Sequence, residues 1–147
     1  MQDRAAIDER GDVATYSTGP LAAPLLLAGD VELEARVRSD QPGFDVSAVL
    51  SRLTPDGRAY NLTQGYRRVE APAPNVVRIG MRALCATLPA GDALRLSLAG
   101  AEFPAFPVNP GGGARLVSAR AIDNQTITLS FRSGGDSPTR LCLPVQP

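Results

Sequence analysis

Val31-Glu32-Leu33-Glu34-Ala35-Arg36-Val37-Arg38 alternates apolar and charged residues without a break. Successive side chains of a β-strand point to opposite faces of its sheet, so this stretch has one apolar face and one charged face. Such a pattern is typical of an antiparallel strand that is buried on one side and solvated on the other. Residues 31–38 therefore predict a β-strand in a layered domain.

The same period of two recurs along the chain. Alternation or β-forming composition marks further strands at residues 46–53, 76–81, 94–98, 127–132 and 141–143. Residues 54–58, which read Thr-Pro-Asp-Gly-Arg, predict a tight turn, because Pro favours the first turn position and Gly accepts a positive φ. This turn should join a strand that ends near Leu53 to one that starts near Ala59. We find no convincing helical stripe.

The chain has 147 residues, the size of one domain. Its thirteen Pro and fourteen Gly are spread among short strands, which favours an all-β sandwich. About eight to ten antiparallel strands fit this length. Residues 1–11 are polar and carry no strand pattern, so we interpret them as a lead-in or linker. Residues 12–147 are interpreted as the single sandwich domain.

The composition excludes several kinds of catalytic site. The chain has no His, and its fifteen basic residues are all Arg. Without His there is no Ser–His–Asp triad, and without Lys there is no Schiff base or P-loop lysine. Two Cys are too few for a four-Cys zinc site. We therefore predict no catalytic residue, no cofactor and no metal site in this chain, which we expect not to be an enzyme by itself.

Fifteen acidic residues balance the fifteen basic ones. A net charge of zero gives no reason to expect a nucleic acid or a membrane as partner. The first residues are rich in charge and do not form the apolar core of a signal peptide. The longest apolar run, residues 21–28, is interrupted by Pro24 and is too short to span a bilayer. The expected location is therefore cytoplasmic, unless the chain is a piece of a protein whose leader lies elsewhere.

Three groups of residues are of types found in catalytic or metal sites, but their surroundings disfavour each of these roles. Cys85 and Cys142 have apolar neighbours and are expected to be buried rather than bridged or reactive. Glu32 and Glu34 share a strand face, as a glycosidase pair could, but arginines continue that face, which favours a solvated surface. Asp40, Asp45 and Asp56 supply too few oxygens in one loop for a convincing calcium site.

The candidate functional segment is aromatic. Phe103-Pro104-Ala105-Phe106-Pro107 begins a Pro- and Gly-rich loop that extends over residues 104–113. A proline-stiffened aromatic loop can bind a partner at low entropic cost, but it could equally close one end of the sandwich. The residues predicted to form an interface are Phe103, Pro104, Phe106 and Asn109. A free-standing module that binds a sugar or a peptide is the alternative, disfavoured because the chain lacks Trp.

Several segments, taken in order, resemble the C-terminal domain of X-Pro dipeptidyl-peptidases and cocaine-esterase-like hydrolases. The resemblance covers the chain from about residue 8 to its end. It is carried by residues 8–21, 29–33, 44–50, 55–59, 65–68, 89–96, 103–110 and 137–145. No single motif is strong, but their order and spacing together are specific.

The resemblance implies a jelly-roll β-sandwich of the galactose-binding-domain-like type, attached to an α/β-hydrolase domain that carries the Ser, Asp and His of the catalytic triad. It implies that the sandwich packs on this hydrolase domain, helps to shape the active-site cleft and can join subunits into a homo-oligomer. The parent protein would be a bacterial serine hydrolase. Asp92 and Glu102 depart from the family pattern, as do the apolar residues 105–108, so the family's polar contacts near Phe103 do not carry over.

Overall fold

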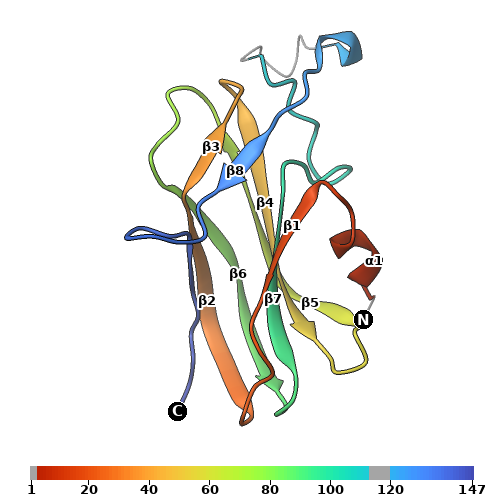
Figure 1. The fold of residues 1–147 in the computed structure, drawn as a ribbon, viewed down its shortest axis with the longest axis vertical. Helices are drawn as coiled ribbons and strands as arrows, with labels where there is room; N and C mark the ends of the chain where they lie inside the picture. Colours follow the sequence, from red (N-terminus) through yellow and green to blue (C-terminus); the bar gives the residue numbers. More distant parts are fainter. Residues whose placement is uncertain (1–2, 113–119) are drawn as a thin grey trace.

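The computed structural model describes residues 3–112 and 120–147 (Figure 1). Within these ranges, two short helices and a series of strands follow one another. In order, they are α1 (Ala5–Asp8), β1 (Val13–Ser17), β2 (Leu25–Ala35), β3 (Val37–Ser39), β4 (Phe44–Leu53), β5 (Ala59–Val69), β6 (Val77–Leu88), β7 (Ala93–Ala99), η2 (Ala121–Asp123), β8 (Leu129–Phe131) and β9 (Arg140–Cys142).

Two antiparallel sheets form a sandwich. One sheet has the strand order β1-β7-β4-β5 and the other β6-β2-β9, while β3 and β8 form a separate two-stranded sheet. Figure 1 shows the β3–β8 pair above β2 and α1 to one side. The nine strands within the described ranges confirm the all-β sandwich and the strand number that the sequence predicted.

The alternating segment at residues 31–38 behaves as predicted on its apolar side. Val31, Leu33, Ala35 and Val37 are all buried. The segment is divided between two sheets, because β2 ends at Ala35 and β3 begins at Val37. β2 pairs with β6 and β9, whereas β3 pairs with β8. The apolar face thus stays buried while the chain changes sheets.

The turn predicted at residues 54–58 is confirmed. The Gly57 N–H donates to the Thr54 carbonyl at 2.9 Å, and the Thr54 N–H donates to the Arg58 carbonyl at 2.9 Å. Gly57 has a φ of 86°, a conformation that glycine adopts without a steric cost. Leu53 and Ala59 are paired directly across the hairpin.

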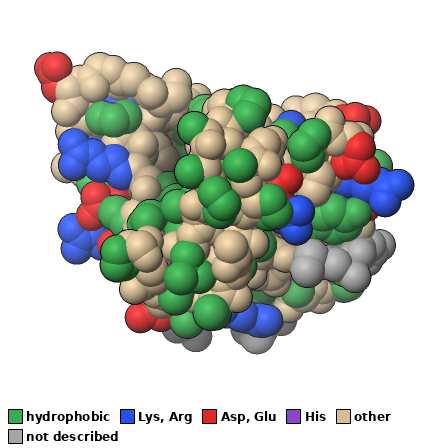
Figure 2. Space-filling model, turned by 90° about the horizontal axis from the view of Figure 1, so that it is seen from below, with side chains coloured by type: hydrophobic (Ala, Val, Ile, Leu, Met, Phe, Trp, Pro, Cys, Tyr) green, Lys and Arg blue, Asp and Glu red, His purple; other side chains and the backbone are tan. Residues whose placement is uncertain are grey.

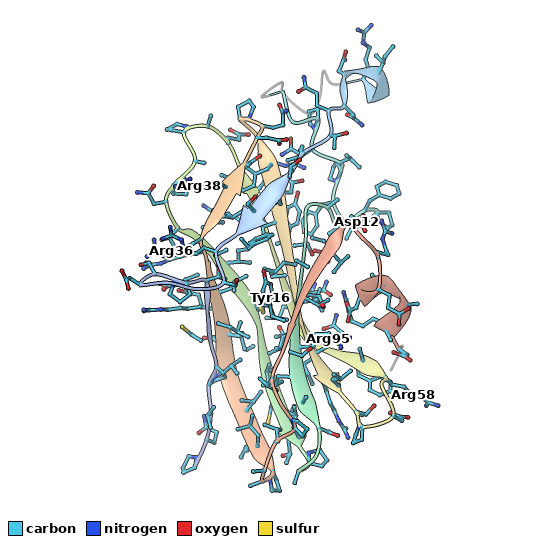
Figure 3. The ribbon with its side chains drawn as sticks, in the orientation of Figure 1. Asp12, Tyr16, Arg36, Arg38, Arg58 and Arg95 are labelled. Carbon is cyan, nitrogen blue, oxygen red and sulfur yellow. The ribbon has the colours of Figure 1, made fainter. Side chains whose placement is uncertain are left out.

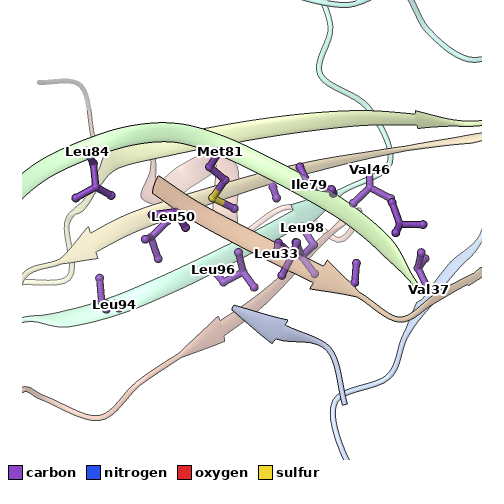
Figure 4. Close-up of a cluster of buried hydrophobic side chains, with 14 of the residues drawn as sticks. Leu33, Val37, Val46, Leu50, Ile79, Met81, Leu84, Leu94, Leu96 and Leu98 are labelled. Atoms are coloured by element: carbon purple, nitrogen blue, oxygen red, sulfur yellow. The ribbon is translucent and has the colours of Figure 1, made fainter. Parts of the chain in front are cut away.

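Leucine, isoleucine, valine and methionine side chains from both sheets fill the space between them (Figure 4). Several of these side chains are completely buried, including Leu27, Leu33, Leu50, Ile79 and Leu88. Burying one such side chain stabilises a protein by roughly 1.5–3 kcal/mol. This layer is the hydrophobic core, and it holds the two sheets together.

The prediction that the two cysteines are buried is wrong, because Cys85 and Cys142 are both exposed and free. Cys85 follows the buried Leu84 on β6, so the period of two turns its side chain away from the core. Cys142 belongs to β9, at the end of its sheet, and lies opposite Glu32 on the solvated face.

The first described residues lie against the sandwich. The Asp3 side chain accepts hydrogen bonds from the N–H groups of Ala5 and Ala59, and these bonds hold the pKa of Asp3 below its usual value. The Asp8 carboxylate is buried and accepts a hydrogen bond from Ser97 of β7 at 2.8 Å. The domain boundary expected at residue 12 stays a prediction. No helix within the described residues is long and apolar enough to cross a membrane.

The two sheets approach closely where β5 meets β6. A Cβ atom added to Gly65 would lie 2.7 Å from the Gly80 carbonyl oxygen and 2.8 Å from Cγ2 of Ile79. Real Cβ atoms essentially never approach backbone oxygens this closely, so β5 and β6 would have to separate. Glycine at position 65 therefore permits the close contact on this side of the sandwich.

We expect Gly65→Ala to lower the free energy of unfolding by about 1–3 kcal/mol, because the extra methyl overpacks the β5–β6 contact. Urea denaturation measures this change. Gly80→Ala is the matched control, because a Cβ at Gly80 meets nothing within 4 Å. The control should change stability by less than about 0.5 kcal/mol. Equal losses in the two variants would contradict the packing argument.

Candidate functional site

The aromatic loop, defined here as residues 103–108, follows β7 and lies at the surface. Phe103 is 74% exposed and Phe106 is 39% exposed. Pro104 is also exposed, whereas Asn109 is buried immediately after the loop. Three of the four residues predicted for an interface are thus exposed, and the fourth, Asn109, is buried.

Phe106 packs on a tyrosine of the four-stranded sheet. Its ring stacks on Tyr66 of β5, with ring centroids 3.8 Å apart and an angle of 3° between the planes. Tyr66 donates its hydroxyl proton to Asp45 Oδ2 at 2.6 Å. Partial burial, reinforced by this hydrogen bond to a carboxylate, raises the pKa of Tyr66 above its usual value. The phenol therefore remains a neutral donor.

The carboxylate of Asp45 on β4 lies at the centre of this site and is 1% exposed. Arg68 of β5 donates to both of its oxygens, from Nε to Oδ1 and from Nη2 to Oδ2, each at 2.8 Å. Asn109 adds a hydrogen bond from Nδ2 to Oδ1 at 2.8 Å. The bonds to Asp45 hold the pKa of Arg68 above its usual value. A buried charge is thus paired and well hydrogen-bonded, as such a charge requires.

These contacts hold the end of the aromatic loop. Arg68 Nη2 also donates to the Pro107 carbonyl at 2.7 Å. Asn109 Oδ1 accepts from the Gly111 N–H at 3.0 Å, which fixes the chain after the loop. Asn109 therefore positions the loop from below.

The beginning of the loop is held by Glu102. Its carboxylate accepts hydrogen bonds from Ser47 Oγ at 2.8 Å and from Gln64 Nε2 at 3.1 Å. The Glu102 carbonyl accepts from the Phe106 N–H at 2.9 Å, which closes a turn across the loop. With both ends fixed, the loop presents Phe103 and Phe106 in a defined conformation.

The acidic residues weighed for calcium have protein partners. Asp45 is bonded as described, Asp40 accepts from the Thr128 N–H at 2.8 Å, and Asp56 accepts from the Thr54 hydroxyl at 2.5 Å. Across the part of the chain that the structure describes, no group of three or more His, Cys, Asp or Glu side chains could hold a metal ion. These carboxylates stabilise turns and attach loops to the sandwich.

The charged face of β2 carries an ion pair rather than a catalytic pair. Glu34 lies opposite Arg78 of β6 and Arg140 of β9, and Arg78 Nη2 is 3.0 Å from its carboxylate. Figure 3 shows Arg36 and Arg38 on the same side of the molecule, directed away from the core. The surface is the solvated charged face that the alternation predicted.

Tyr66, Arg68 and Asp45 are not among the residues that the sequence predicts for this site. Asp45 enters the sequence-based predictions as a disfavoured calcium ligand and, like Tyr66 and Arg68, as part of a family motif. One signal was available, because the predicted hairpin brings residues near 45 opposite residues near 67. An acidic and a basic residue at such positions indicate a cross-strand ion pair.

The geometry defines a class of protein: an antiparallel β-sandwich domain that presents apolar rings on a fixed loop. The sequence profile of the X-Pro dipeptidyl-peptidase C-terminal non-catalytic domain matches residues 2–137. The chain belongs to this family, and the resemblance found in the sequence is confirmed.

A curated relative is the cocaine esterase of Rhodococcus sp. (strain MB1 Bresler). The two are 27% identical over 155 aligned positions, which cover 97% of this chain and 27% of the esterase. The chain therefore spans about a quarter of the length of this relative.

Solved structures share the fold. An aminopeptidase from a marine sediment archaeon, Thaumarchaeota archaeon, matches 99% of this chain with a TM-score of 0.91 and 18% identity. An α-amino acid ester hydrolase matches 99% of the chain with a TM-score of 0.88 and 20% identity. The matched parts are 28% and 27% of those two chains, respectively.

Asp45→Ala should lower the free energy of unfolding by about 3 kcal/mol or more, because it leaves the partly buried Arg68 without its counter-charge. Urea denaturation measures the loss, and limited proteolysis should show faster cleavage in the aromatic loop. Asp56→Ala is the control, since this acidic residue on the hairpin turn is exposed. Its effect should stay below about 1 kcal/mol. If the aromatic loop is cleaved no faster in Asp45→Ala than in the wild-type chain, Asp45 does not hold the loop in place.

Proposed function

We propose that this chain is the non-catalytic C-terminal β-sandwich of a larger serine hydrolase of the X-Pro dipeptidyl-peptidase or esterase type. The family match over residues 2–137 carries the proposal. The relatives named above as esterase, ester hydrolase and aminopeptidase are all several times longer than the matched region. The nucleophilic Ser and its His would lie in the remainder of the polypeptide, because this chain has no His.

The proposed partner is an α/β-hydrolase domain of the same polypeptide, and the aromatic loop is the proposed contact. Phe103 contributes the largest exposed side chain, Phe106 and Pro104 extend the surface, and Asn109 supports it from beneath. Covering the exposed part of Phe103 would contribute on the order of 1–2 kcal/mol. Because the loop is already held by Arg68 and Glu102, little conformational entropy is lost on docking.

The composition of the loop determines what kind of surface it can meet. The side chains at residues 105–108 are all apolar, and Val108 is 45% exposed. They match an apolar patch on the hydrolase domain better than a charged one, because a buried charge without a partner is costly. A sandwich docked there would form one wall of the active-site cleft. The cytoplasmic location and the homo-oligomer stay predictions.

The native polypeptide should be several times heavier than the 15.4 kDa of this chain. An antibody raised against the chain would detect it in extracts of the source cell. A serine-directed fluorophosphonate should label that polypeptide outside residues 1–147, because the nucleophile lies in the other domain. A band at 15.4 kDa would favour the free-standing binding module, and a label inside residues 1–147 would favour a self-contained enzyme.

Within the full-length polypeptide, Phe103→Ala combined with Phe106→Ala should weaken docking and reduce activity. We expect kcat/KM for 4-nitrophenyl butyrate and for an Ala-Pro 4-nitroanilide to fall about tenfold or more. Hydrogen exchange in residues 103–108 should become faster, because the docked domain no longer protects them.

Two matched variants separate docking from local folding. Phe103→Ala alone leaves the Phe106–Tyr66 stack intact. It should still lower kcat/KM and protection from exchange, but by less than the double variant. Ile122→Ser replaces an 84% exposed side chain on η2 and should change neither activity nor exchange. If the double variant keeps full activity and unchanged protection from exchange, the aromatic loop is not the docking surface. The family assignment does not depend on this result.

A further inference from the structure

The sandwich is closed on one side and open on the other. Gly65 of β5 packs against β6 on the closed side. On the opposite side, β1 and β9 are the end strands of their sheets. A pocket of about 270 Å³ lies between them. In Figure 2, hydrophobic side chains gather over the lower end of the sandwich, around a hollow in the surface.

Leucines from both sheets form the inside of this pocket. Leu50, Leu94 and Leu96 come from the four-stranded sheet, while Leu141 of β9 and the adjacent Leu143 come from the other side. These residues are far apart in the sequence and meet only because the sheets face each other. The lining offers an apolar group a surface that water solvates poorly.

The hydroxyl groups at the rim are mostly committed to the protein. Thr18 Oγ1 accepts from the Leu94 N–H at 3.0 Å, and Thr139 Oγ1 accepts from the Arg36 N–H at 3.1 Å. Ser17 Oγ accepts from Arg95 Nε at 3.0 Å. Tyr16, which is 40% exposed, and Ser133 also line the pocket, and within the described residues neither hydroxyl has a hydrogen-bond partner. Figure 3 shows Tyr16 near the middle of the molecule, on β1.

No charged side chain belongs to the described lining of the pocket. The cation at the rim, Arg95, is bonded to Ser17 Oγ and lies 3.8 Å from the Asp8 carboxylate. An ion among the lining leucines would therefore lose its hydration without gaining a free counter-charge, which is unfavourable. An apolar cavity of about 150 Å³ accommodates benzene, so the larger volume here admits a ring with a few further atoms. The Tyr16 hydroxyl can form one hydrogen bond to such a molecule.

We propose that the pocket between β1 and β9 binds a neutral small molecule with one or two fused aromatic rings and a single hydrogen-bonding group. The Leu side chains enclose the rings, and the Tyr16 hydroxyl bonds the polar group. For a ligand of this size in a half-open pocket, the expected dissociation constant is on the order of 0.1–1 mM. This site is independent of the docking surface at the aromatic loop.

The test titrates the 147-residue chain against 5-fluoroindole and follows the ligand by ¹⁹F NMR. Binding should broaden the ligand resonance saturably, and unlabelled indole should reverse the broadening. Leu143→Phe should weaken binding at least tenfold by filling the pocket. Val145→Phe is the matched control, because Val145 lies outside the lining, is 55% exposed and should leave binding unchanged.

Further titrations test the hydrogen bond from Tyr16 and the preference for a neutral ligand. Tyr16→Phe should weaken 5-fluoroindole binding severalfold and leave 4-fluorotoluene binding unchanged, because only the first ligand has a hydrogen-bonding group. The anion of 5-fluoroindole-3-acetic acid should bind at least tenfold more weakly than 5-fluoroindole. Backbone amide shifts in the wild-type chain should map to residues 16–18, 94–96 and 141–143, which provides a readout if Leu143→Phe does not fold.

The proposal is overturned if 5-fluoroindole produces no saturable broadening, if Leu143→Phe and Val145→Phe bind it equally, or if the amide shifts map to residues 103–108. Binding to this chain that disappears in the full-length polypeptide also overturns it, because the pocket would then be covered by another domain. The first two outcomes leave the docking proposal unaffected, because its test uses different residues and a different readout.

Discussion

Burial of the apolar inner faces of the two main sheets is the interaction on which the other features of this domain depend. Each long strand has only one apolar side, and that side avoids water only when the second sheet covers it. The requirement directs the charges of β2 to solvent and leaves Cys85 exposed one position after a buried leucine. It also makes the two sides of the sandwich different. Close backbone contact at Gly65 closes one side, and the separation of β1 from β9 leaves a pocket on the other.

The outer face of the four-stranded sheet has a second constraint, the buried carboxylate of Asp45. Removing a carboxylate from water is costly unless charge and hydrogen bonds replace its hydration. Arg68, Tyr66 and Asn109 supply these contacts. Each is also tied to the loop beyond β7: Arg68 donates to the Pro107 carbonyl, Tyr66 stacks on Phe106, and Asn109 directly follows the loop. The energetic requirement of one buried charge thus holds a surface loop in a defined conformation. The exposed rings of that loop are held in place before any partner arrives.

Local sequence predicted part of this site and missed the rest. The Pro-rich composition of residues 103–107 indicated an irregular aromatic segment, and the structure has it exposed. The support beneath it depends on strand register. Counting outward from the Leu53–Ala59 pair places Asp45 opposite Arg67, but a bulge near Leu50 shifts the pairing by one residue. Asp45 therefore meets Arg68, and a shift of one residue also reverses the face on which a side chain lies.

The sequence by itself determined that the chain is all-β and that it holds no histidine for a catalytic site. Alternation, turn residues and composition act over a few positions, so they can be read locally. The tertiary structure alone decided which strands pair, where β4 and β5 shift register, that Asn109 is a buried support and that leucines from both sheets line a pocket. The reason is physical: these features depend on residues far apart in sequence, whose proximity follows from packing of the whole core and not from any local preference.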